Sequence, residues 1–283
     1  MLIQETHVDV QTTANGKESS MRIFLFHPII PGYPNARFPG VCLFSEIYQV
    51  TGPVARFARQ IAGHGYIVAA PSSYHDFVGP EPLKYDVADT DRGNQFKIEK
   101  TLESYDADSY KTVDHLLSLP TCTGLIGATG MCLGGHLAVR AALDPRISAT
   151  VAYFATDIHS RTLGPNSGPN TASAPPSPSS THTLDLFPNF KGEAAMIFGI
   201  KDTHVPDAGR DLIRQKLRDA GVVFSWHEFA WAQHAFIRDE LSKGRYDPAV
   251  TKICFEVLLE LFGRVLKTDL GQPEAVPALE HVC

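Results

Sequence analysis

The stretch GATGMCLGGHLAV, residues 127–139, sets the strictest condition on the fold of this chain. An apolar run of small residues ends at Cys132, and a helical pattern begins directly after it. Gly130 and Gly134 flank the cysteine in the G-x-nucleophile-x-G pattern of a sharp strand-to-helix turn, in which the nucleophile takes a strained conformation and its neighbours must be small. The alternative is a structural cysteine buried in a glycine-rich turn. The position between a strand and a helix favours the nucleophile.

Apolar runs alternate with helical patterns on both sides of this turn. Strands are expected at 40–44, 66–70, 124–130, 147–155, 194–200 and 222–229, and helices at 53–63, 104–118, 134–143, 206–220 and 248–266. This alternation predicts an α/β fold in which helices on both faces cover a mostly parallel sheet. Before it, β-rich residues 5–13 and 21–26 flank Asn15-Gly16, which predicts an antiparallel hairpin at the N-terminus.

Composition narrows the class of protein. The 283 residues are 43% hydrophobic and 20% charged, and we expect residues 1–283 to form one α/β domain. The net charge of −6, without a basic run, argues against a nucleic-acid partner. The sequence lacks a signal-peptide pattern and an apolar run of membrane-spanning length, so we expect a cytoplasmic protein with no membrane partner. Five cysteines without a CxxC pair indicate reduced thiols.

Two segments interrupt the alternation, residues 72–100 and 158–190. Both follow strands, and an open α/β sheet places its ligand crevice at the carboxyl ends of its strands. The second segment contains GPNSGPNTASAPPSPSST, a composition that favours a disordered surface insertion. The other interpretation is a mobile lid, in which His182 and the aromatic residues of LDLFPNF line a pocket.

A nucleophile in this type of turn needs an acid and a histidine, which follow it in that order along the chain. Asp202 in GIKDTHVP and His234 in FAWAQHAF each follow one of the later strands. Asp202 could instead be a helix cap, and His234 could be a loop histidine without a catalytic role. Their joint spacing favours a Cys132–His234–Asp202 triad. His204 stands two residues from Asp202 on the same turn, so His234 is the preferred base. Histidines and cysteines do not have metal-ligand spacing, and we expect no metal.

The segments LFSEIYQV, GMCLGG, GIKDTHVP and QHAFIR, in this order, resemble the dienelactone hydrolase family of the α/β-hydrolase fold, over most of residues 20–265. The resemblance implies a hydrolase that cleaves a small lactone or ester through a thioester and uses no cofactor. It also implies that Glu46 contacts the cysteine and protects the resting thiol until substrate binds. The backbone N–H groups of Ile47 and Leu133 match the family's oxyanion donors.

The resemblance further implies a substrate with a carboxylate that two arginines hold. Arg238, four residues after His234, matches one arginine, and Arg92, the only arginine of residues 72–100, is the candidate for the other. The two interrupting segments indicate a remodelled pocket, so a larger, polyketide-like lactone or thioester stays open as the substrate. The expected assembly is a monomer or a homodimer.

Two other classes of function remain open at this point. One is a ligand-binding protein that keeps the hydrolase scaffold without turnover, because a fold does not fix a function. The other uses Cys132 as a redox or isomerising centre, which would need a resolving thiol such as Cys42 or Cys122.

Overall fold

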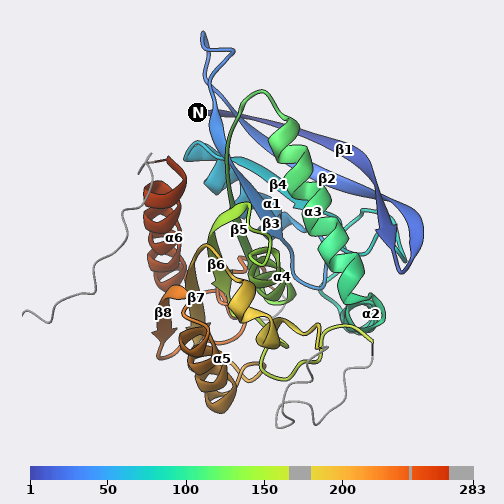
Figure 1. Ribbon diagram of the computed structural model, residues 1–283, viewed down its shortest axis with the longest axis vertical. Helices are drawn as coiled ribbons and strands as arrows, with labels where there is room; N and C mark the ends of the chain where they lie inside the picture. The colour runs from blue at the N-terminus through green and yellow to red at the C-terminus, as the bar shows by residue number, and fades with distance from the viewer. Residues whose placement is uncertain (166–179, 242–243, 268–283) are drawn as a thin grey trace, which may run out of the picture.

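A single eight-stranded sheet forms the centre of the molecule, with the strand order β1-β2-β4-β3-β5-β6-β7-β8 (Figure 1). This computed structural model describes residues 1–165, 180–241 and 244–267. The strands are β1 (Leu2–Ala14), β2 (Lys17–Ile29), β3 (Phe38–Phe44), β4 (Ile67–Pro71), β5 (Cys122–Met131), β6 (Ile147–Tyr153), β7 (Glu193–Gly199) and β8 (Val223–Phe229).

The N-terminal hairpin and the parallel part of the sheet both follow the predicted pattern. β1 pairs with β2 from Leu2↔Ile29 to Ala14↔Lys17, and the turn between them contains Asn15 and Gly16, both with positive φ. β2 then joins β4 in antiparallel orientation, and the remaining neighbours from β4 to β8 are parallel. The mostly parallel sheet with an antiparallel N-terminal hairpin is therefore confirmed.

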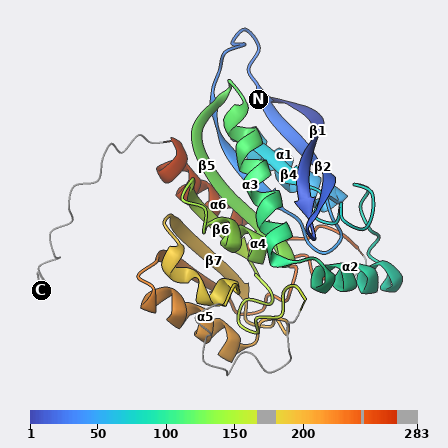
Figure 2. The ribbon, with the colours of Figure 1, turned by 45° about the vertical axis from the view of Figure 1, so that its right-hand side comes forward.

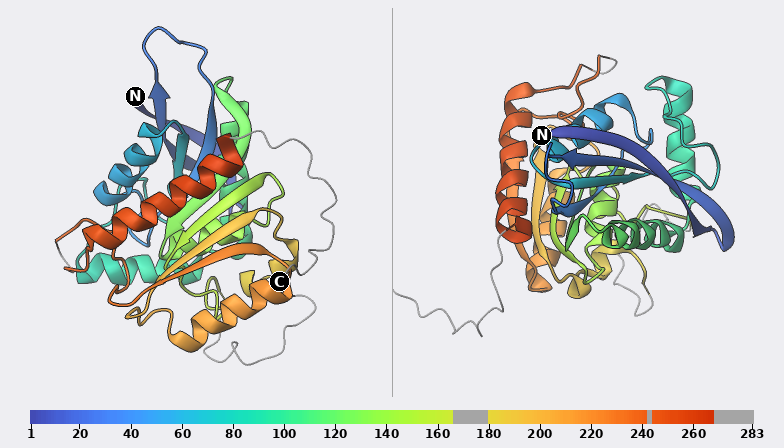
Figure 3. Two further views of the ribbon diagram at one scale, coloured as in Figure 1. Left: turned by 90° about the vertical axis from the view of Figure 1, so that its left-hand side faces the viewer. Right: turned by 90° about the horizontal axis from the view of Figure 1, so that it is seen from above.

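Helices cover both faces of the sheet. They are α1 (Gly52–Gly63), α2 (Val87–Glu99), α3 (Leu102–Ser118), α4 (Leu133–Ala141), α5 (Asp207–Asp219) and α6 (Pro248–Phe262), the last followed by a π-helical turn at Gly263–Lys267. Along β3, Val41 and Leu43 belong to the core with α1 and α6, whereas Cys42 and Phe44 belong to the core with α3, α4 and α5. In the left view of Figure 3, α1 and α6 lie together in front of the sheet. None of the described helices combines the length and hydropathy that a membrane crossing requires.

Helix α2 lies in the segment 72–100, where the apolar pattern predicted no helix. Its sequence VADTDRGNQFKIE has no apolar stripe, and Gly93 is its only buried residue. The side chain of Asp86 caps the helix by accepting a hydrogen bond from the N–H of Asp89. Because Phe96 is the only α2 side chain packed against the described core, hydrophobic periodicity could not reveal the helix. Figure 2 shows α2 at the end of the molecule, next to one end of α3.

The second interrupting segment contributes to the core. The expected disorder of the proline-rich part falls on residues 166–179, which lie outside the described residues. In LDLFPNF, the side chains of Leu184, Phe187 and Phe190 are buried in the core cluster that also contains residues of α3 and α4. These aromatic side chains therefore pack inside the protein and do not form a lid.

The order of the strands reverses at β3 and β5, and this reversal positions the site. β3 leads to β4 on one side, whereas the chain continues from β5 through β8 on the other. Phe44 and Gly130 are paired where the two central strands end. Residues that directly follow β3 and β5 consequently meet at the crevice where open α/β sheets bind their ligands.

Candidate active site

Cys132 occupies the sharp turn between β5 and α4. Its backbone has φ 59° and ψ −120°, a strained combination for a residue with a side chain. The turn is tight because α4 approaches the end of β3. A Cβ atom on Gly134 would collide with the carbonyl oxygen of Phe44 and lie 2.6 Å from that of Ser45. Glycine is thus required by the close contact of two backbones, and the thiol is held at the N-terminus of α4.

The thiol of Cys132 is more accessible than the other described thiols. Cys132 is partly exposed, whereas Cys42, Cys122 and Cys254 are free and buried. Burial raises the pKa of Cys42 well above its usual range and that of Cys254 to about 12. These two thiols are therefore protonated at neutral pH. Among the described cysteines, Cys132 is the one that lines the cavity described below.

His234 and Asp202 form a buried pair beside the cysteine. His234 Nδ1 lies 2.8 Å from Asp202 Oδ2, and the other carboxylate oxygen accepts a hydrogen bond of 2.8 Å from the backbone N–H of His204. Burial alone would raise the pKa of Asp202, but the hydrogen bond and positive charge of His234 lower it. With Nδ1 donating to the carboxylate, Nε2 is the ring nitrogen available to the thiol.

The protonation of His234 depends on both neighbours. Burial alone would lower its pKa, but the negative charge of Cys132 and hydrogen bonds with Asp202 and Cys132 raise it to about 10. The ring of His204 lies 4.3 Å from that of His234, and burial together with the positive charge of His234 lowers the pKa of His204. These opposite shifts favour a protonated His234 and a neutral His204.

Glu46 follows β3 and forms an ion pair with Arg238. Glu46 is 2% exposed, and its Oε2 lies 3.4 Å from Arg238 Nη1. The guanidinium of Arg238 also lies over the rings of Tyr85 and Tyr48, at 4.8 and 5.7 Å from their centroids. Burial raises the pKa of Glu46, and the charges of Arg238 and His234 oppose this shift. Among the described residues, no hydrogen bond joins Glu46 to Cys132.

These residues surround a cavity of about 180 Å³. It is lined by Glu46, Ile47, Tyr48, Thr90, Asn94, Lys97, Cys132, Thr156, Asp157, His204, His234, Arg238 and Arg245. Five residues expected from the sequence are among them, and Asp202 lies behind His234. Leu133 is buried at the first position of α4, where a backbone N–H has no partner within the helix. The cavity is polar and contains groups of both charges.

The structure does not bring Arg92 to this cavity. Its side chain is 49% exposed, lies 2.8 Å from Asp89 and stacks over Phe96. Thr90 and Asn94 line the cavity from the same helix. Arg92 lies two positions from each of them, so its side chain is turned by about 200° around the helix axis. Arg92 therefore does not line the cavity in this structure, and its contact with the substrate stays a prediction that this position does not support.

Lys97 and Arg245 are cationic cavity residues that the sequence did not reveal. Lys97 lies on α2, and Arg245 lies in the chain between His234 and α6. The spacing of Thr90, Asn94 and Lys97 would have marked one face of α2, had a helix been expected there. For Arg245 the sequence carried no such signal.

Known proteins that are similar to this chain carry the names of one family of hydrolases. The dienelactone hydrolase family matches residues 26–266. A Saccharomyces cerevisiae protein named "Putative carboxymethylenebutenolidase" is 52% identical over 286 residues and covers 100% of both chains. A Synechocystis protein of the same name is 24% identical, over 92% of this chain and 99% of its own. The crystal structure of a "Putative Dienelactone Hydrolase" from Klebsiella pneumoniae has a TM-score of 0.71 at 19% identity, covering 92% of this chain and 99% of its own.

Proposed function

The chain belongs to the dienelactone hydrolase family, and we propose that it cleaves a small lactone or ester by covalent catalysis at Cys132. The family is one of carboxymethylenebutenolidase-like hydrolases, which act on carboxylic esters. The observation that carries the proposal is the strained turn at Cys132, with the hydrogen-bonded His234 and Asp202 beside it in one cavity. A monomer suffices for this reaction, because one chain supplies all of these residues.

In the proposed reaction, the Cys132 sulfur attacks the substrate carbonyl carbon and forms a tetrahedral intermediate. The N–H groups of Leu133 and Ile47 stabilise its oxyanion, each by about 3–4 kcal/mol. Protonated His234 gives its proton to the leaving alkoxide, and a thioester on Cys132 remains. His234 then takes a proton from water, which attacks the thioester; the acid and the Cys132 thiolate are released, and His234 is protonated again. Asp202 orients His234 in both steps.

Glu46 is proposed to protect the thiol of Cys132 before substrate binds. Glu46 and Cys132 both line the cavity, and Arg238 Nη1 lies 3.4 Å from the carboxylate of Glu46. In the resting enzyme, we expect Glu46 to approach the thiol and protect it. Substrate that engages Arg238 then changes the position of Glu46 and exposes the nucleophile.

Arg245 replaces Arg92 as the proposed partner of a substrate carboxylate. The charge of Arg238 is already balanced by Glu46, whereas no carboxylate is paired with Arg245 in the parts of the chain that the structure describes. We expect Arg245→Met to raise KM for a carboxylated enol-lactone by about tenfold or more, because a charge-assisted hydrogen bond contributes about 1.5–3 kcal/mol. Steady-state kinetics with an uncharged ester provide the control. An equal change in KM for both substrates would contradict the assignment.

The hydrolase proposal is tested by product formation without an added cofactor. Purified protein is incubated with 4-nitrophenyl acetate and with a carboxylated enol-lactone, and the released acid is measured. The proposal expects acid from at least one substrate, in proportion to the protein present. Binding of the lactone without product from either compound would instead favour the ligand-binding alternative.

A further inference from the structure

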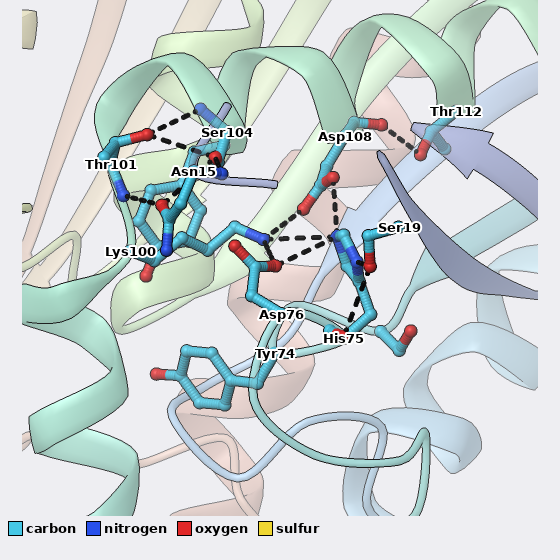
Figure 4. A network of polar contacts seen from close by, with 12 residues as sticks. Asn15, Ser19, Tyr74, His75, Asp76, Lys100, Thr101, Ser104, Asp108 and Thr112 are labelled. Atoms are coloured by element: carbon cyan, nitrogen blue, oxygen red, sulfur yellow. Dashed lines mark hydrogen bonds and ion pairs between the residues drawn. The ribbon is translucent and has the colours of Figure 1, made fainter. Parts of the chain in front are cut away.

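Helix α2 is a polar surface helix that is nevertheless anchored at its C-terminal end. Lys100 directly follows it and is fully buried, with its ammonium 2.8 Å from Asp108 Oδ2 and in contact with Asp76 (Figure 4). His75 joins the same cluster through a distance of 2.8 Å between its Nε2 and Asp108 Oδ1. Buried charges are costly to separate, so this cluster fixes where α2 ends.

The middle of α2 is held against the loop that follows β3. A Cβ atom on Gly93 would collide with the carbonyl oxygen of Ile47, which shows how closely the two backbones approach. The hydroxyl of Tyr74 donates to the carbonyl oxygen of Gly93 at 2.9 Å, and the hydroxyls of Tyr48 and Thr90 lie 2.9 Å apart. A helix without a core-facing stripe is thus held at a fixed distance from the proposed oxyanion donor.

One face of α2 forms a wall of the cavity. Thr90, Asn94 and Lys97 share this face at helical spacing, and all three line the cavity. The Lys97 ammonium lies 3.0 Å from Asp157 Oδ2. Burial alone would raise the pKa of Asp157, but the charge of Lys97 together with hydrogen bonds from Thr156 and Lys97 keeps the pKa below its usual range. The charges of the pair therefore cancel.

The groups on this wall both donate and accept hydrogen bonds. The amide of Asn94 makes no hydrogen bond within the described residues, so its N–H and C=O groups are available to a ligand. The pair of Lys97 and Asp157 offers ammonium hydrogens beside carboxylate lone pairs. A hydroxyl group, which donates one hydrogen bond and accepts others, matches such a surface better than an anion or an alkyl group.

We propose that the α2 face of Asn94 and Lys97, with Asp157, binds hydroxyl groups of the substrate, which makes a hydroxylated lactone or ester the preferred class. This inference rests on the proposed hydrolase function. It adds that the substrate carries hydroxyl groups besides its reacting carbonyl. A substrate without hydroxyls leaves these polar groups unpaired, and a site built for hydrogen bonds discriminates against such an analogue.

The experiment compares a dihydroxylated γ-lactone with γ-butyrolactone, which share the reacting ring. We expect kcat/KM of the wild-type protein to be at least about tenfold higher for the dihydroxylated lactone, and Asn94→Leu to remove most of this ratio. Gln95→Leu is the matched control, because Gln95 is exposed on the same helix and bonded to Glu99. It should keep the wild-type ratio.

The outcomes separate this inference from the function on which it rests. Equal kcat/KM values for the two lactones, or a ratio that survives Asn94→Leu, would overturn hydroxyl recognition by α2. The same holds if neither lactone is cleaved while 4-nitrophenyl acetate still acylates Cys132. If neither lactone is cleaved and no acylation occurs, the proposed hydrolase function fails as well.

Discussion

Cys132→Ala is expected to lower kcat for ester or lactone hydrolysis by more than about 10⁴-fold, the size of effect seen when a catalytic nucleophile is removed. Alanine keeps the Cβ atom and the tight turn between β5 and α4, but it removes the sulfur that would carry the acyl group. The residual rate would come from oxyanion binding and substrate positioning alone. Initial rates under saturating substrate measure the loss.

The loss of kcat can be attributed to the missing sulfur only if the variant folds like the wild type. Circular dichroism and thermal unfolding should match the wild type, since Cys132 is only partly buried. Cys254→Ala is a matched control, because Cys254 is a free cysteine of α6 that is buried in the core of the protein. We expect that variant to keep its kcat. An alanine variant at position 132 with wild-type turnover would exclude covalent catalysis by this thiol.

Lys100→Met is expected to lower the free energy of unfolding by about 3–5 kcal/mol, because it leaves buried carboxylates without their cation. The side chains of Lys100, Asp76 and Asp108 are 0%, 1% and 5% exposed. His75, Asp76 and Asp108 offer donor atoms of the kind that bind a metal ion, but the Lys100 ammonium lies among them. In this structure the lysine is the cation of the cluster.

Urea denaturation measures this effect, with Arg92→Met as the comparison on the neighbouring helix. The ion pair of Arg92 with Asp89 is exposed, so we expect its loss to cost about 0–1 kcal/mol. A triple variant, Lys100→Met with Asp76→Asn and Asp108→Asn, should recover part of the stability, since it removes the stranded charges. A cost for Lys100→Met as small as that for Arg92→Met would show that the buried cluster does not stabilise the fold.

The sequence predicted those features that depend on local patterns. Hydrophobic periodicity identified the strands and the core-facing helices, and the small residues around Cys132 identified the turn, because steric limits there act between close neighbours in the chain. Helix α2 escaped prediction because it has no apolar stripe; polar contacts and the single ring of Phe96 hold it in place. The pairing of Glu46 with Arg238 joins residues far apart in the sequence and becomes visible only in the folded chain.

The assignment of cationic residues shows the same limit. Arg92 was chosen because it is the only arginine of residues 72–100, but the rotation of α2 directs Lys97 to the cavity instead. Arg245 reaches the cavity through the path of the chain after β8, for which no short motif exists. Predicting such side chains requires the orientation of a helix or loop, which sequence spacing alone does not supply.

Rapid-quench mass spectrometry of the intact protein with 4-nitrophenyl acetate is the decisive measurement, because it detects the thioester itself. We predict an acyl adduct that maps to Cys132, appears before steady state, decays as acid is released and is absent from Cys132→Ala. Acid release without an adduct on Cys132, or with an adduct confined to another residue, would contradict covalent catalysis at this turn.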